Sequence, residues 1–93
     1  AYQSLLMQNH PNPFNPRTMI PFQLQNPANI LLQVYDMRGQ RVTTLANGFH
    51  PAGQHQLLWN GTNSQGQPVA SGVYIYRLQT PERSESRKLV LQK

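Results

Sequence analysis

The sequence predicts an all-β domain in which about seven short strands form two facing sheets. Apolar and polar residues alternate along several short segments, as they do in strands that bury one face. No window of ten or more residues has the apolar spacing of an amphipathic helix. Glycine, proline, asparagine and serine gather between these segments, which is typical of turns. With 93 residues, the chain has room for one hydrophobic core.

Residues 9–16 carry three prolines and three asparagines around one large apolar side chain, Phe14. Because proline fixes φ and lacks a backbone donor, this composition excludes a helix and the interior of a paired strand. We expect a stiff lead-in, polyproline II broken by turns, that delivers Phe14 into the core at little entropic cost. A disordered linker is the alternative. The predicted structural motif includes Pro11, Asn12, Pro13 and Phe14 in this segment, and Asp36, Gly39 and Trp59 further along the chain.

This interpretation also sets the expected domain boundary. Residues 1–8 are predicted to be the end of a linker from an upstream domain, because the chain enters the proline segment abruptly. Residues 9–93 are then the folded domain.

The first two predicted strands cover residues 18–24 and 29–35. Pro21 places the first strand at a sheet edge, because proline cannot donate to a ladder. Each strand has three apolar residues on one face. The residues expected to point inward are Ile20, Phe22 and Leu24 in the first strand and Ile30, Leu32 and Val34 in the second.

A hairpin turn is predicted at residues 36–39, followed by a strand at 40–45. Gly39 supplies the positive φ that so short a turn requires, and Asp36 opens the turn, so both are assigned to the structural motif. Asparagine, glycine and proline then predict a loop over residues 47–53.

The rest of the chain adds strands and turns of the same kind. Trp59 is expected at the centre of the core, and the strand around Ile75 is apolar on nearly both faces, which predicts a central position in its sheet. Short strands at this spacing are typical of a sandwich of the immunoglobulin type. The predicted strands are 54–60, 73–78 and 87–92, and the predicted turns are 61–68 and 81–86.

Composition excludes several classes of partner. The net charge is +5, but the eight lysines and arginines are scattered and lack interleaved aromatic residues, so nucleic-acid binding is not expected. No apolar run approaches the roughly 20 residues that cross a bilayer, so no membrane insertion is expected. The chain has no cysteine, so disulfides and thiol chemistry are impossible.

Residues suited to catalysis or metal binding are few. The histidines lack the spacing of paired ligands, and all three acidic residues fall in predicted turns. Hydrolysis requires paired carboxylates in a cleft, or a nucleophile with a base and an orienting acid, and we expect neither, because Asp36 is the only aspartate and lies in a turn of a domain too small for a deep pocket. We therefore expect no catalytic residue, no metal site and no cofactor. The residues considered are His10, His50, His55, Asp36, Glu82 and Glu85.

Four aromatic residues could serve either the core or a ligand: Tyr35, Trp59, Tyr74 and Tyr76. Exposed in one plane, they would form a platform of the kind on which sandwich modules stack sugars. Because Trp59, Tyr74 and Tyr76 are in phase with other apolar residues, we favour the core.

Five motifs in order along the chain resemble one family, the type A C-terminal sorting domains of the type IX (Por) secretion system. His10 stands where that family usually has tyrosine, and Asn60 where it usually has aspartate. Immunoglobulin-like domains of the flagellar hook-cap (FlgD) type share the middle of the pattern. The resemblance covers about residues 8–93. The matching segments are 8–22 with QNYPNPFNPxTxIxF, 34–42 with VYDxxGxxV, 52–61 with AGxHxxxWDG, 69–78 with VASGVYFYRL and 87–93 with KLVLxK.

The resemblance implies an immunoglobulin-like domain at the carboxyl end of a larger secreted enzyme or adhesin of a Gram-negative bacterium. Such a domain is not an enzyme; it directs its cargo through the periplasm to the cell surface or the medium. The implied partners are the outer-membrane translocon, the sortase that typically removes the domain, and the upstream catalytic or adhesive domain. By this analogy, the recognition surface includes Gly72, Val73, Tyr74, Lys88, Leu89, Val90, Leu91 and Lys93.

A physical argument points to the same end of the chain. A last strand at a sheet edge presents unpaired backbone groups, with which a partner can pair by strand addition. Two alternatives stay open: an accessory carbohydrate-binding module of a secreted hydrolase, and a structural immunoglobulin-like spacer.

Overall fold

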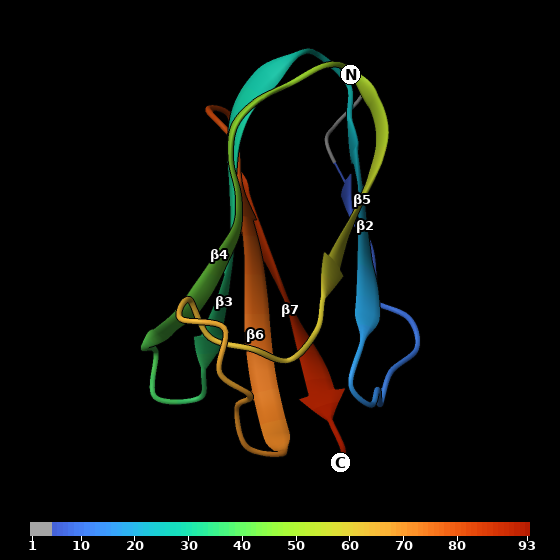
Figure 1. Ribbon diagram of the computed structural model, residues 1–93. Coiled ribbons are helices and arrows are strands. Elements are labelled where there is room, and N and C mark those ends of the chain that lie inside the picture. Colours follow the sequence, from blue (N-terminus) through green and yellow to red (C-terminus); the bar gives the residue numbers. More distant parts are fainter. Residues whose placement is uncertain (1–4) are drawn as a thin grey trace.

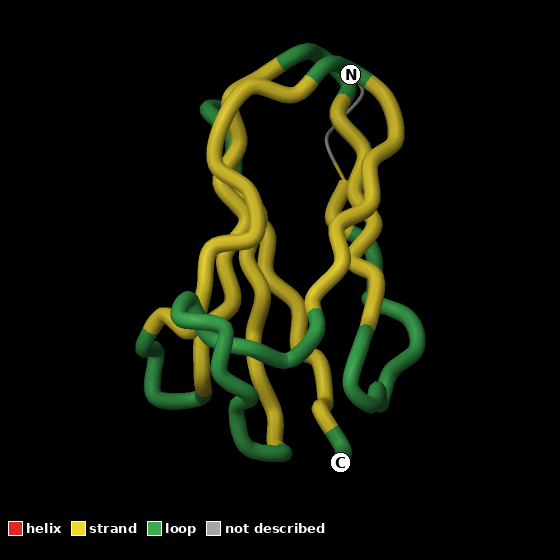
Figure 2. Tube along the Cα trace, in the orientation of Figure 1, coloured by secondary structure: helices red, strands yellow, loops and turns green. Residues whose placement is uncertain are grey.

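The computed structural model describes residues 5–93, which form seven strands in two antiparallel sheets and no helix (Figure 1). Within this range, no element could therefore cross a membrane as a helix. One sheet has the order β1-β2-β5 and the other β4-β3-β6-β7. Figure 2 shows the two layers face to face, which confirms the predicted sandwich. The strands are β1 (Leu5–Leu6), β2 (Thr18–Leu24), β3 (Ala28–Asp36), β4 (Arg41–His50), β5 (Gly53–Trp59), β6 (Gly72–Gln79) and β7 (Ser84–Leu91).

The core lies between the sheets and is built from alternate residues of the facing strands. Every second residue of β2 is buried, and the predicted inward faces of residues 18–24 and 29–35 are confirmed. Trp59 is 1% exposed and packs between Phe14 and Tyr74, with ring centroids 5.6 and 5.5 Å away. The predicted central position of Trp59 is therefore confirmed, as is that of β6, which lies between β3 and β7.

The predicted hairpin turn after β3 is also confirmed. Gly39 has a φ of 86°, a conformation that favours glycine. Asp36 Oδ1 accepts hydrogen bonds from the backbone N–H groups of Arg38 and Gln40, at 2.9 and 3.0 Å. The aspartate therefore holds the turn closed from its side chain.

The loop predicted over residues 47–53 is wrong in its first half. Asn47 pairs with Leu31 and Gly48 with Ile30, so β4 continues to His50. The backbone hydrogen bonds to β3 outweigh the turn preference of asparagine and glycine, and only residues 51–52 connect β4 to β5. The turn predicted at 81–86 is shortened for the same reason, because β7 already pairs with β6 from Ser84.

The prediction that Pro21 marks an edge strand is also wrong, because β2 pairs with β1 on one side and β5 on the other. The proline is tolerated because its backbone faces β1. Its carbonyl accepts a hydrogen bond from the N–H of Met7 at 3.0 Å, just where the short strand β1 ends. The missing N–H therefore costs no bond to β5.

The folded part of the chain begins earlier than residue 9. Leu5 and Leu6 form β1 and pair with Gln23 and Phe22, and the side chain of Leu6 is buried. Residues 5–8, which we expected in a linker, therefore belong to the domain, while the rest of that linker lies outside the described residues.

The proline-rich lead-in is ordered and places Phe14 in the core, as predicted. Its backbone bends at residues 11–13 and 15–16, and the peptide bonds before Pro11, Pro13 and Pro16 are cis. The N–H of Phe14 donates to Val90 O at 3.0 Å, and Phe14 O accepts from the N–H of Gln92 at 2.9 Å. The lead-in thus joins β7 while its one aromatic ring fills the core.

A buried polar cluster of Asn9, Thr18 and Tyr76 fixes the start of the lead-in. Asn9 Nδ2 donates to Thr18 Oγ1 at 3.0 Å, and the N–H of Asn9 donates to the Tyr76 hydroxyl at 2.9 Å. That hydroxyl donates to Met7 O at 2.7 Å. Because these buried polar groups are hydrogen-bonded, the cost of taking them out of water is recovered.

Phe14→Ala tests the contribution of the lead-in to stability. Removing a ring that is 2% exposed should lower the free energy of unfolding by about 3 to 5 kcal/mol. Phe49→Ala is the matched control, because Phe49 is 67% exposed and its loss should change stability by less than about 0.5 kcal/mol. Urea unfolding followed by far-UV circular dichroism measures both, and equal effects would contradict the packing described above.

Tyr76→Phe tests the polar cluster. At about pH 7, the variant should lose about 1 to 3 kcal/mol, because Asn9 N–H and Met7 O stay buried without a partner. Burial raises the pKa of the Tyr76 hydroxyl above its ordinary value. Wild type should therefore lose more stability than the variant as the pH rises from about 10 through the folded pKa, because unfolding frees Tyr76 to ionise. Urea unfolding at rising pH should show the gap to Tyr76→Phe narrowing; a constant gap would contradict this.

Candidate functional site

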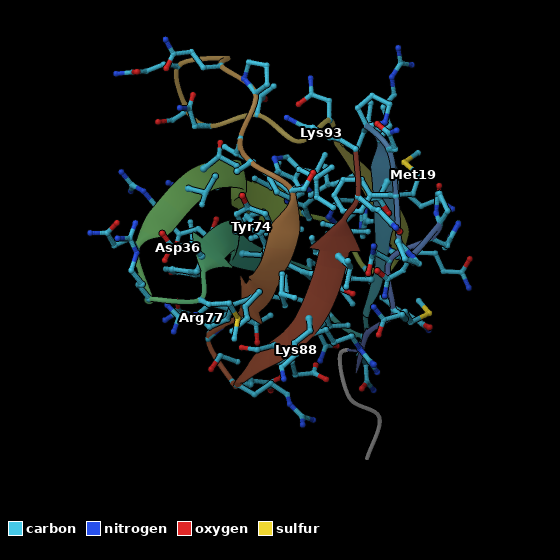
Figure 3. All side chains as sticks on the ribbon, turned by 90° about the horizontal axis from the view of Figure 1, so that it is seen from below. Met19, Asp36, Tyr74, Arg77, Lys88 and Lys93 are labelled. Carbon is cyan, nitrogen blue, oxygen red and sulfur yellow. The ribbon has the colours of Figure 1, made fainter. Side chains whose placement is uncertain are left out.

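The residues predicted for partner recognition meet on two neighbouring strands. In the ladder of β6 and β7, Gly72 lies opposite Leu91, Val73 opposite Val90 and Tyr74 opposite Leu89. Figure 3 shows Lys88 on β7 and Lys93 beyond the end of that strand. Two segments that are separated in the sequence therefore form one continuous ribbon, the β6–β7 ribbon.

The side chains of the ribbon divide between its two faces. Tyr74, Leu89 and Leu91 point into the core and are 8% exposed or less, so in the folded domain they are core residues. The Tyr74 hydroxyl donates to Ala70 O at 2.6 Å, and burial raises its pKa above the ordinary value. Three of the eight predicted recognition residues are thus held inside the sandwich.

The remaining members of the predicted set are accessible. Val73 is 39% exposed, Val90 is half-buried and Lys88 is exposed. Lys93 is exposed but fixed, because its N–H donates to Ser71 Oγ at 3.1 Å and its Nζ donates to Val69 O. The surface available to a partner is therefore the outer face of the ribbon together with the lysine at its end.

The outer edge of β7 is closed over its second half. Val90 N–H donates to Asn12 Oδ1 at 2.9 Å, and Val90 O accepts from Phe14. Lys88 O accepts a hydrogen bond from Gln8 Nε2 at 2.9 Å. The lead-in therefore covers the edge that we expected to be free near the end of the chain. No local pattern in the sequence marks a contact across 80 positions, which is why Gln8 was missed.

Along the first half of the β7 edge, the described residues 5–93 form no backbone hydrogen bond to the outward groups. Along an antiparallel strand, the backbone N–H and C=O groups of successive residues point alternately toward one neighbouring strand and away from it. Thr80 N–H donates to Arg83 O at 2.8 Å, and Val90 bonds to the lead-in, so the even-numbered residues of β7 face away from β6. Ser84 and Ser86 therefore point their backbone groups outward, and neither residue has a hydrogen bond from that edge among those of residues 5–93.

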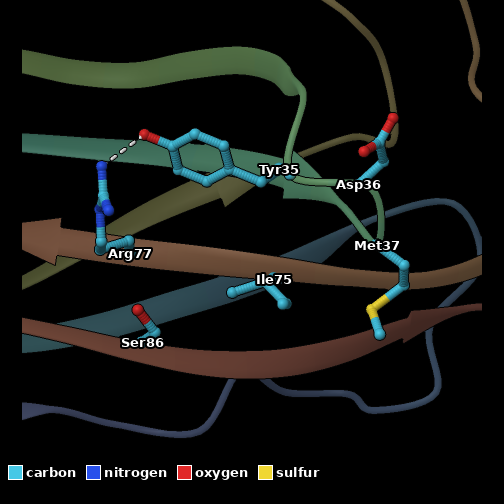
Figure 4. A pocket seen from close by; sticks show the side chains of 7 residues that line it. Tyr35, Asp36, Met37, Ile75, Arg77 and Ser86 are labelled. Carbon is cyan, nitrogen blue, oxygen red and sulfur yellow. Dashed lines mark hydrogen bonds between the residues drawn. The ribbon is translucent and has the colours of Figure 1, made fainter.

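A shallow hollow of about 260 Å³ lies on the outer face of the four-stranded sheet (Figure 4). At its margin, Arg77 Nη2 donates to the Tyr35 hydroxyl at 2.8 Å, and the guanidinium lies 5.0 Å from the centre of that ring. The Tyr35 hydroxyl donates to Gln33 Oε1 at 2.6 Å. Asp36 lines the hollow, but its carboxylate is engaged in the turn. The hollow thus offers an arginine and apolar surface, and it lacks a second carboxylate.

The aromatic residues do not form a flat exposed platform. Trp59 and Tyr76 are buried, and the rings of Trp59 and Tyr74 meet at 75°. Trp59 Nε1 donates to Thr62 O at 2.9 Å. Tyr35 alone of the four is partly accessible, and Arg77 lies over it. The assignment of Trp59, Tyr74 and Tyr76 to the core is therefore confirmed.

Two of the three histidines meet, although their spacing gave no reason to expect it. The rings of His50 and His55 lie 5.2 Å apart beside Phe22, because β4 extends to His50 and β5 begins shortly after it. His55 Nε2 lies 2.8 Å from Pro51 O. Among the described residues 5–93, no three histidine or carboxylate side chains gather in the manner of a metal site.

Comparison with solved structures reveals the same fold in larger proteins. Dimeric latent PorU from Porphyromonas gingivalis matches with a TM-score of 0.75 and 16% identity over 98% of this chain. PorZ, a surface component of the type IX secretion system of the same species, matches with a TM-score of 0.65 and 21% identity over 92%. The chain spans 10% of PorU and 11% of PorZ. FlgD from P. aeruginosa matches with a TM-score of 0.64 and 19% identity, over 95% of this chain and 72% of FlgD.

These identities are low, so the structural likeness shows the fold alone. The comparison with curated proteins finds no match. The model of the FlgD Ig-like domain matches residues 14–84, which is most of the chain and includes β2 to β6. The immunoglobulin-like sandwich that the sequence predicted is thereby confirmed, and the chain belongs to the FlgD Ig-like domain family.

Proposed function

We propose that this chain is a non-catalytic C-terminal targeting domain that directs a larger cargo protein through the type IX secretion system. The cargo would be an upstream catalytic or adhesive domain, and its destination the cell surface or the medium, reached through the periplasm. The proposed partners are the outer-membrane translocon and the sortase that releases the domain. The domain itself contributes a surface for recognition and no chemistry.

One observation carries the proposal: two motifs of the sorting-domain resemblance lie side by side. The segment at 69–78 forms β6 and the segment at 87–93 forms most of β7, and the two strands are paired throughout. If these two motifs served folding alone, that role would account for their buried residues. It would not account for the accessible Val73 and Lys88, which belong to the same motifs.

The fold comparisons support the proposal without establishing it. PorZ is a surface component of a type IX secretion system, and it contains a domain of this fold. FlgD also contains the fold and serves hook capping in flagellar assembly. The fold therefore occurs in proteins with different roles, and the motifs that resemble sorting domains support the targeting role for this chain.

The alternative of a carbohydrate-binding module has lost its main support, because Trp59, Tyr74 and Tyr76 are buried and cannot form an exposed platform. A structural spacer is the remaining alternative. It predicts that substitutions on the accessible face of the β6–β7 ribbon have no effect on the location of the cargo.

Accessible side chains give a sharper test than removal of the tail. Deleting residues 88–93 would also remove Leu89 and Leu91 from the core and unfold the domain. The combined variant Val73→Ser, Lys88→Ala and Lys93→Ala leaves the core intact. A cargo fusion carrying it should accumulate in the periplasm of a bacterium with this secretion system. We expect at least a tenfold fall in the secreted fraction, measured by immunoblot of medium and periplasm.

The matched control truncates the same types of side chain elsewhere. Leu58→Ser, Arg17→Ala and Arg41→Ala alter one exposed apolar and two exposed cationic residues, on β5, directly before β2 and on β4. This fusion should be secreted normally, and urea unfolding should give both variants a stability within about 1 kcal/mol of wild type. Normal secretion of the first variant would overturn the proposed surface and favour the spacer.

A further inference from the structure

We propose that residues 84–88 of β7 form a docking site for an extended segment of a partner protein in which acidic residues alternate with apolar ones. The segment would add to the four-stranded sheet as a fifth strand beside β7. This inference rests on the proposed function and deepens it, because it specifies where the partner pairs and which chemistry the partner brings.

The site has unused backbone groups in a row. Ser84 and Ser86 point their N–H and C=O groups away from β6, and Lys88 points its N–H the same way. An added strand would form hydrogen bonds with these five groups, as strands do when they extend a sheet. The spacing of about 3.3 Å per residue gives an open edge of roughly 15 Å, enough for a segment of about five residues.

The site also has a defined end. From Lys88 O onward, the outward groups of β7 are engaged by the side chains of Gln8 and Asn12 and by the backbone of Phe14. Displacing that cover would pull the Phe14 ring out of the core, which would destabilise the domain. A partner therefore gains more by pairing with residues 84–88, where no hydrogen bond from residues 5–93 occupies the outward backbone N–H groups.

Charge selects the partner. Residues 83–88 contain Arg83, Arg87 and Lys88 against the single acid Glu85, which gives a net charge of +2 (three positive minus one negative). Arg83 Nε lies 3.9 Å from Glu85 Oε2, and Arg87 Nε donates to Leu6 O at 2.7 Å. A second copy of this edge would bring like charges together, which opposes pairing between copies. An acidic segment gains from the same charges.

A hollow beside the edge of β7 is the reason why we expect apolar residues at alternate positions of the partner segment. It has a volume of about 230 Å³ and is lined by Ile75, Ser86, Arg87 and Lys88. Because the Ser86 side chain is small, a neighbouring strand could reach across it with a branched or aromatic residue onto the half-buried Ile75. Alternate residues of the added strand would face this hollow, and those between them would point to the other face.

The variants Ser86→Pro and Ser86→Ala separate backbone pairing from side-chain effects. The Ser86 N–H faces away from β6, so proline removes an outward donor and obstructs the edge without breaking the ladder. Alanine keeps the donor. The probe is a synthetic peptide of alternating glutamate and isoleucine, and a lysine and isoleucine peptide of the same length is the charge control. Titration into the isotope-labelled 93-residue chain, followed by amide NMR, measures affinity and site together.

We expect the glutamate peptide to shift the amide signals of Ser84, Ser86 and Lys88 and to slow their hydrogen exchange. It should bind the alanine variant like wild type and the proline variant at least tenfold more weakly, while the lysine peptide should bind at least tenfold more weakly than the glutamate peptide. Equal binding to both serine variants, perturbation centred on Val90 and Gln92, or no binding by the glutamate peptide would overturn the docking site. Unfolding curves in urea confirm that the proline variant is folded.

Secretion of the cargo fusion distinguishes this inference from the function on which it rests. If the Ser86→Pro fusion is secreted normally while the variant at Val73, Lys88 and Lys93 is retained, the docking site is wrong and the targeting function stands. If the Ser86→Pro fusion is retained and the Ser86→Ala fusion is secreted, the docking site is supported in the cell.

Discussion

The insertion of Phe14 between the two sheets is the constraint on which the rest of the structure depends. Its ring packs against Trp59 with centroids 5.6 Å apart, and its backbone bonds to Val90 and Gln92 on β7. One residue thus fills the core and ties the N-terminal segment to the last strand. A chain of 93 residues without cysteine has no disulfide to stabilise it, so it depends strongly on its core and its hydrogen bonds. The proline-rich lead-in accordingly adds a link between the ends of the chain.

The polar cluster behind the lead-in makes this link specific. Asn9, Thr18 and Tyr76 are buried. Their hydrogen bonds can form only if Asn9 lies beside Thr18 of β2 and Tyr76 of β6, which fixes the position of the lead-in along these strands. An apolar contact alone would allow the segment to slide, whereas a misplaced asparagine would leave several donors unsatisfied. Phe14 therefore supplies stability, and Asn9 supplies position.

Local rules predicted the strands well where side chains decide the structure. The alternation of Ile20, Phe22 and Leu24 identified the buried face of β2, and Gly39 identified a turn that requires a positive φ. The predictions failed where backbone pairing decides. Asn47 and Gly48 prefer turns, yet pairing with β3 holds them in β4. Pro21 occupies a paired strand because its backbone, which lacks an N–H donor, faces the two-residue strand β1 and not β5.

The candidate site was predictable only in part, for a related reason. Motif resemblance selected the β6–β7 ribbon, and alternation could have separated Val73 and Val90 from the buried Tyr74, Leu89 and Leu91. The cover over the second half of β7 could not be predicted, because it consists of contacts between residues about 80 positions apart. Such contacts depend on the whole fold and leave no local pattern.

An exposed edge is a hazard in a β-domain, and this chain controls it by two different means along one strand. Near the C-terminal end of β7, the lead-in takes up the outward backbone groups, which also completes the core. Near the N-terminal end, no residue from 5 to 93 forms such a cover, and Arg87 and Lys88 discourage pairing with a like-charged edge instead. Backbone cover excludes every strand, whereas charge excludes only some. The first half of β7 can therefore be selective, and the second half cannot be reached without unfolding part of the domain.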